Sequence, residues 1–203
     1  MALDYEEKYY KQGIKLIVGV DEAGRGPLLG PVVAGAVILP PYFKSGLIDD
    51  SKKLSAKKRD DAYKLIVESA LSYGVGVVSA KEIDEINTYQ ASRLAMTRAI
   101  ENLNHQYEMI LSDAMPLPNF DCPVEAIIKG DAKASCIAAG SIIAKVTRDK
   151  MMVELDEKYP HYGIKNHKGY PTKEHLEALE KYGPIIDEHR FTYKPVQKFK
   201  KKI

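Results

Sequence analysis

Short apolar runs alternate with longer amphipathic stretches along the chain. The apolar runs are rich in β-branched residues and are bounded by acids, glycines or prolines, which predicts strands. The first two runs are joined by a short glycine-rich link, which favours antiparallel pairing. The predicted strands cover residues 15–20, 31–39, 73–80, 108–112 and 124–128.

The stretches between and after these runs have helical periodicity. Ser55 predicts the start of a helix that reaches about Ser72, and Thr172 predicts the start of another that Gly183 and Pro184 end. Apolar positions repeat on one face over residues 87–103, and a long helical pattern runs from Asp131 toward Lys158.

Three strands come first, and strands then alternate with helices. This order predicts an α/β protein with a mixed five-stranded sheet, antiparallel at first and flanked by helices. A length of 203 residues, with 45% apolar and 29% charged side chains, is suited to a single globular domain.

Composition excludes some classes of protein and leaves others open. No apolar run approaches the roughly 18 to 20 residues of a membrane span, and the first residues do not resemble a signal peptide, so we expect a cytoplasmic protein. Cys122 and Cys136 are too few for a disulfide scaffold. The net charge of +2 makes no case for nucleic acid by itself.

Acidic residues follow three of the predicted strands. Asp21 and Glu22 come directly after the first, Asp113 ends the fourth, and Asp131 follows the fifth. Strand ends gather ligand sites in α/β proteins, so the four carboxylates are expected to converge and to bind Mg²⁺ or Mn²⁺. Two such ions roughly 4 Å apart are typical of phosphodiester hydrolysis. Taken singly, Asp131 is better explained as a helix cap and Asp113 as a turn residue than as metal ligands.

Glycines and basic residues lie beside these acids. The loop from Gly24 through Arg25 and Gly26 matches neither dinucleotide-binding nor P-loop spacing, but its backbone can approach a ligand closely. Lys53 and Lys133 lie near acids in the sequence, and Lys145 and Arg148 lie further along the predicted helix. This arrangement is suited to the phosphates of a polyanionic substrate. A tight turn and a solvated face are the alternative explanations.

Five motifs in order resemble the bacterial ribonuclease HII family, the type 2 ribonucleases H. They are Val-Asp-Glu-Ala-Gly-Arg-Gly-Pro at 20–27, Asp-Ser-Lys-Lys-Leu at 50–54, Lys-Gly-Asp-Ala-Lys at 129–133, Ala-Lys-Val-Thr-Arg-Asp at 144–149 and His-Lys-Gly-Tyr at 167–170. The resemblance implies a ribonuclease H-like core over about 14–150, a helical C-terminal part over 151–195 and a basic tail over 196–203.

The resemblance also implies roles for single residues. Asp21, Glu22, Asp113 and Asp131 would form a four-carboxylate catalytic centre that binds Mg²⁺ or Mn²⁺. The backbone of Gly24, Arg25 and Gly26 would recognise a ribose 2′-hydroxyl, and Tyr170 would stack on the deoxyribose beyond an RNA-to-DNA junction.

The expected activity is hydrolysis of the RNA strand of RNA–DNA hybrids and cleavage 5′ of ribonucleotides embedded in duplex DNA. We expect a monomer without an obligate protein partner or membrane contact. Two other hypotheses stay open at this point: a non-catalytic hybrid-binding protein, and a different two-metal nuclease on the same fold.

Overall fold

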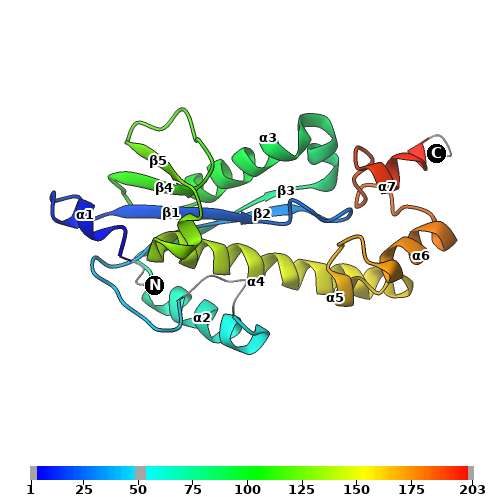
Figure 1. Cartoon of the computed structure of the whole chain (residues 1–203), viewed down its shortest axis with the longest axis horizontal. Helices are drawn as coiled ribbons and strands as arrows, with labels where there is room; N and C mark the ends of the chain where they lie inside the picture. Colours follow the sequence, from blue (N-terminus) through cyan, green and yellow to red (C-terminus); the bar gives the residue numbers. More distant parts are fainter. Residues whose placement is uncertain (1–3, 49–53, 201–203) are drawn as a thin grey trace.

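Five strands form one mixed sheet in the order β3-β2-β1-β4-β5 (Figure 1). The structure is a computed structural model that describes residues 4–48 and 54–200. Strand β1 pairs antiparallel with β2 and parallel with β4, while β2–β3 is antiparallel and β4–β5 parallel. The mixed sheet predicted from the sequence is confirmed. The strands are β1 (Ile17–Ala23), β2 (Val32–Ile38), β3 (Ser72–Val78), β4 (Met109–Asp113) and β5 (Val124–Ile127).

Helices cover both faces of the sheet. Helix α3 packs on one face, and α4 packs on the other with α2 against its outer side (Figure 1). None of the helices in the described part of the chain is long and apolar enough to cross a membrane. The helices are α1 (Glu7–Tyr10), α2 (Ala56–Ser69), α3 (Ala80–Glu101), α4 (Ser135–Lys158), α5 (Ile164–His167), α6 (Lys173–Tyr182) and α7 (Lys194–Gln197), with 3₁₀ turns η1 (Gly130–Ala132) and η2 (Pro160–Tyr162).

Helix α3 begins earlier than the apolar pattern predicts. Ser79 and Glu82 form a reciprocal capping box at its start, and the backbone of Asn87 leaves the helical region with a φ of 68°. The prediction began at residue 87 because the periodic apolar face emerges only beyond this kink. The box itself is a sequence signature of a helix start.

Alternation along β1 divides its side chains between the two faces. Val18 and Val20 join the core beneath α3, and Ile17 packs with the first turn of α4. Helix α4 lies directly on the sheet backbone, because a Cβ on Gly140 would stand 2.6 Å from the carbonyl oxygen of Gly35. This close contact brings the N-terminal part of α4 beside β1 at Asp21.

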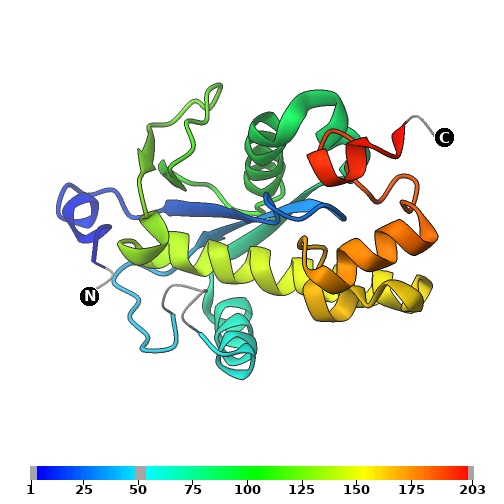
Figure 2. The ribbon, with the colours of Figure 1, turned by 45° about the vertical axis from the view of Figure 1, so that its right-hand side comes forward.

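The C-terminal helices α5, α6 and α7 gather at the end of the sheet that the β1–β2 connection reaches (Figure 2). Leu28 of that connection packs with Leu179, Val196 and Phe199. The lysine-rich segment is therefore anchored by its apolar residues as far as Phe199, which charge alone did not indicate.

Candidate metal centre and glycine loop

Three of the four predicted carboxylates converge. Asp21 lies near the end of β1, Asp113 is the last residue of β4, and Asp131 lies in the turn η1. Since β1 and β4 are parallel neighbours, their carboxyl ends share one edge of the sheet. One carboxylate oxygen from each residue lies within 4.8 Å of the other two. Asp21 thus meets Asp113 and Asp131 although both lie far beyond it in the sequence.

Short hydrogen bonds hold the carboxylates in place. Asp113 Oδ1 accepts the backbone N–H of Gly130 at 2.7 Å, which ties the end of β4 to the turn that carries Asp131. Asp21 Oδ1 accepts the N–H of Glu22 at 2.7 Å, and the side chain of Ser141 on α4 also hydrogen-bonds to Asp21. Ser141 was not among the predicted site residues.

The surroundings disfavour negative charge on these acids. Burial raises the pKa of Asp21 well above its usual value, and the charges of Glu22 and Asp113 raise it further. Burial also raises the pKa of Glu22, and Asp113 adds to this effect while Arg25 opposes it. Each additional carboxylate is costly unless a cation lies among them.

Glu22 lies beside the trio rather than within it. Its Oε1 forms an ion pair with the Arg25 guanidinium at 3.3 Å. Its Oε2 is buried and has no hydrogen-bond partner in the described part of the chain. A buried carboxylate oxygen without a donor, next to three clustered acids, fits a hard divalent cation.

Asp21, Glu22 and Asp113 open into a cavity of about 360 Å³, whereas Asp131 is not part of its lining. Of the predicted site residues, Lys53 lies outside the described residues, and Lys133 is exposed and lies outside the lining. Sequence reasoning missed Arg59, which α2 contributes. The lining consists of Asp21, Glu22, Ala23, Gly24, Arg25, Gly26, Arg59, Asp113, Ser141, Lys145, Arg148 and Tyr170.

The glycine loop is fixed by a buried guanidinium. Gly24 has a φ of +98°, a backbone conformation that residues with a side chain rarely adopt. The side chain of Arg190 donates to the carbonyl oxygens of Gly24, Arg25 and Gly30 at 2.7 to 3.0 Å. Because the C=O and N–H of a trans peptide unit point in opposite directions, the N–H groups of Arg25 and Gly26 face away from Arg190.

Arg148 differs from the expectation that it would face a polyanion. Its guanidinium is buried and donates to the carbonyl oxygens of Pro31, Leu29 and Lys168. It therefore holds the far end of the glycine loop against the segment that precedes Tyr170. A buried arginine and a substrate-binding arginine look the same in sequence.

Tyr170 lies against the glycine loop. Leu28 N–H donates to the Gly169 carbonyl at 2.8 Å, which docks the Tyr170 segment on the loop. A Cβ on Gly26 would stand 3.4 Å from Tyr170 Cε1, and the tyrosine is 44% exposed. The ring therefore borders the cavity with one side open to solvent.

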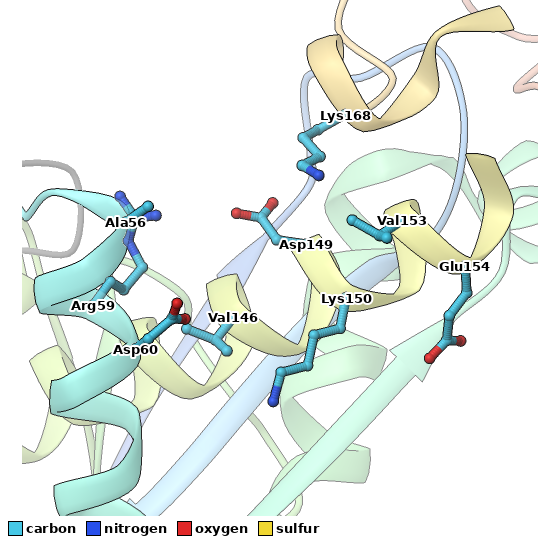
Figure 3. A pocket seen from close by; sticks show the side chains of 9 residues that line it. All are labelled: Ala56, Arg59, Asp60, Val146, Asp149, Lys150, Val153, Glu154 and Lys168. Carbon is cyan, nitrogen blue, oxygen red and sulfur yellow. The ribbon is translucent and has the colours of Figure 1, made fainter. Parts of the chain in front are cut away.

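A second cavity of about 430 Å³ lies between α2 and α4, and Arg59 borders both cavities (Figure 3). Figure 3 shows Lys168 directed from its loop toward Asp149 of α4. Both basic and acidic side chains line this cavity, so its charge does not favour a polyanion. The carboxylate centre, in contrast, clearly favours a cation.

The mixed sheet, with acids clustered at the ends of two parallel strands, defines an α/β protein of the ribonuclease H-like class. The family model for ribonuclease HII matches residues 18–196. Ribonuclease HII of Bacillus subtilis (strain 168) is 55% identical over 196 residues, which are 97% of this chain and 76% of that protein. The chain belongs to the ribonuclease HII family.

Solved structures agree with this assignment. The ribonuclease H2 of Pyrococcus horikoshii OT3 is 30% identical, with a TM-score of 0.77 over 92% of this chain and 97% of that one. The ribonuclease HII in a complex with PCNA from Archaeoglobus fulgidus is 27% identical, with a TM-score of 0.72 over 88% and 95% of the two chains. The chain is thus an enzyme of the ribonuclease H type.

Proposed function

We propose that this enzyme hydrolyses the RNA strand of RNA–DNA hybrids and cuts 5′ of ribonucleotides embedded in duplex DNA, leaving 3′-hydroxyl and 5′-phosphate ends. The observation that carries the proposal is that two features meet at one cavity, the carboxylate cluster, through Asp21 and Asp113, and the glycine loop. The first suits metal-assisted phosphodiester hydrolysis, and the second suits close backbone contact with a sugar.

The carboxylates would hold Mg²⁺ or Mn²⁺. Asp21, Asp113 and Asp131 supply the clustered oxygens, and Glu22 Oε2 supplies a buried oxygen beside them. When bound, divalent ions lower the pKa of an attacking water and neutralise the departing oxygen. We place all four acids in the catalytic centre, in accordance with the family resemblance.

The loop and Tyr170 would select the substrate. Arg190 fixes the peptide units that carry the N–H groups of Arg25 and Gly26. With Gly24, the backbone of this loop would position a ribose 2′-hydroxyl, the group that distinguishes RNA from DNA. The Tyr170 ring, half-exposed at the cavity, would stack on the next deoxyribose. Lys53 and Lys133 would contact phosphates further out.

Outside the catalytic centre, we propose a cytoplasmic enzyme that acts as a monomer on nucleic acid and needs no obligate protein partner. The docking of α5, α6 and α7 on the β1–β2 connection supports a single unit, because Leu28 and Leu29 of that connection are buried by residues from the C-terminal part.

The test is cleavage of end-labelled DNA duplex that contains one ribonucleotide, beside an all-DNA duplex and an RNA–DNA hybrid, with Mg²⁺, Mn²⁺ or chelator. We expect one cut 5′ of the ribonucleotide, cleavage of the hybrid, and no cleavage of all-DNA or in chelator. Binding without cleavage of either ribose-containing substrate would instead indicate a binding protein. Cleavage of the all-DNA duplex would indicate another nuclease on the same fold.

A further inference from the structure

Three buried histidines form a cluster directly behind Tyr170. They are His167 of α5, His175 of α6 and His189 in the segment that precedes α7. The rings of His167 and His175 stack with centroids 4.3 Å apart and planes 8° from parallel. The proposed catalysis uses none of them.

A directed chain of hydrogen bonds leads from His189 to Tyr170. His189 Nδ1 accepts the N–H of Ile185 at 2.8 Å, so a neutral His189 carries its proton on Nε2. That N–H donates to His175 Nε2 at 3.1 Å, which places the proton of His175 on Nδ1. His175 Nδ1–H in turn donates to the carbonyl oxygen of Tyr170 at 2.9 Å.

His167 fixes the residue before Tyr170 in the same way. Its Nδ1 accepts the N–H of Gly169 at 3.0 Å, and its Nε2–H donates to the carbonyl oxygen of Tyr162 at 2.9 Å. All six ring nitrogens of the cluster thus have partners that a neutral ring satisfies. A metal ion would have to displace these bonds, so the cluster is not a metal site.

Burial supports the neutral state of the rings. It lowers the pKa of His189 to about 3, and it also lowers the pKa of His175. The groups that face His189 are the rings of His175 and Tyr162, and His167 faces His175. No carboxylate is among the causes that shift either pKa, and the backbone hydrogen bonds that favour a charge on His175 and His189 are outweighed by burial.

We propose that the histidine cluster positions Tyr170, by fixing the backbone of residues 169 and 170 so that the ring lies against the glycine loop where the sugar is selected. This inference rests on the proposed role of Tyr170 in the proposed function. The histidines are positioning residues, because they reach the cavity only through the Tyr170 segment.

A matched pair of substitutions isolates the last bond of the chain. Asn at 175 can present a donor near the position of Nδ1, whereas Gln presents its polar group near the position of Nε2. Gln thus removes the side-chain donor to the Tyr170 carbonyl and leaves it the backbone N–H of Thr172, at 2.8 Å. The measurement is the ratio of kcat/KM on duplex DNA with one ribonucleotide to kcat/KM on a uniform hybrid. We expect His175→Gln to lower this ratio about fivefold, and His175→Asn to restore most of it.

The same substitution in a Tyr170→Ala background separates positioning from general destabilisation. Tyr170→Ala keeps the backbone carbonyl but has no ring to position, so adding His175→Gln should lower the ratio no further. A loss that persists in this background would overturn the proposal. His105→Gln, at an exposed histidine outside the cluster, is the control and should leave the ratio unchanged.

Each variant is first checked for cooperative unfolding. If His175→Gln does not fold, His189→Asn replaces it, because Asn can still accept the Ile185 N–H while removing the donor to His175, and the same loss is expected. Loss in Tyr170→Ala but in neither histidine variant would overturn this proposal alone. Loss in none of the variants would overturn the sugar-contacting role of Tyr170 as well.

Discussion

Asp21 combines burial with charge at a single residue, which makes it the sharpest test of the metal centre. Asp21→Asn keeps the shape and the acceptor for the Glu22 N–H but removes the negative charge. We expect the single-turnover cleavage rate to fall about a thousandfold, because metal-assisted stabilisation of the reacting phosphate is worth several kcal/mol. Asp121→Asn, at an exposed acid, should cleave normally. Retained turnover by folded Asp21→Asn would remove this residue from the centre.

Gly24 is required for a different reason, its backbone. A Cβ there would stand 2.2 Å from Arg148 Nε and 2.7 Å from the Pro31 carbonyl oxygen, at a φ of +98°. We expect Gly24→Ala to lower the free energy of unfolding by about 2 kcal/mol and to weaken cleavage at ribonucleotides. Gly46→Ala is the matched control, since a Cβ there meets nothing within 4 Å. Denaturant unfolding measures the free energy of unfolding of both variants. If Gly24→Ala were as stable as Gly46→Ala, the expected strain at Gly24 would be contradicted.

At the scale of elements, the C-terminal helices carry the buried histidines, and stability at low pH reports on them. The pKa of His189 is about 3 in the fold, whereas an unperturbed histidine in the unfolded chain has a pKa of 6.5. The ring is therefore neutral in the fold at pH values well above 3. Its contribution is present above pH 6.5 and is lost as the pH falls toward 3, because the unfolded chain binds the proton first. From pH 7 to pH 5 the loss amounts to about 2 kcal/mol.

The measurement is the difference in unfolding free energy between the wild type and His189→Asn at each pH. The raised pKa values of Asp21 and Glu22 act in the opposite direction over this range, and both proteins contain these acids, so the difference cancels them. We expect the advantage of the wild type to shrink on acidification. Parallel curves would show that His189 binds its proton as readily in the fold as in the unfolded chain, which would contradict the lowered pKa.

Elements were predictable where the signal is local. Ser55 and Thr172 accept N–H groups at the helix starts that they predict, and the apolar runs became the five strands. The histidine cluster was not predictable, because its members come from three separate segments and meet only after α6 docks. Arg148 was assigned to the substrate for the same reason, since its burial depends on long-range packing.

For the whole molecule, strand order determined most of the candidate site. Acids that follow apolar runs converge because β1 and β4 are parallel neighbours, so periodicity and position together predicted the cluster before the structure. The sequence did not show that Glu22 would lie beside the trio, because β1 continues through Asp21 and Glu22 instead of ending before them. Nor did it show that the two arginines Arg148 and Arg190 would join the C-terminal part to the glycine loop.

The carboxylate centre lowers the stability of the whole fold unless a cation is bound, and this gives the last prediction. Asp113→Asn keeps the acceptor for the Gly130 N–H and removes a charge that raises the pKa of Asp21 and Glu22. In chelator we expect the variant to be more stable than the wild type by about 1 kcal/mol. Mg²⁺ at a hundred times its Kd should stabilise the wild type by about 2.7 kcal/mol and the variant by much less. Thermal unfolding of both proteins in chelator and in Mg²⁺ measures these differences in stability. If Asp113→Asn is less stable than the wild type in chelator, contacts within the fold stabilise the charged acids. Their burial would then not require a cation among them.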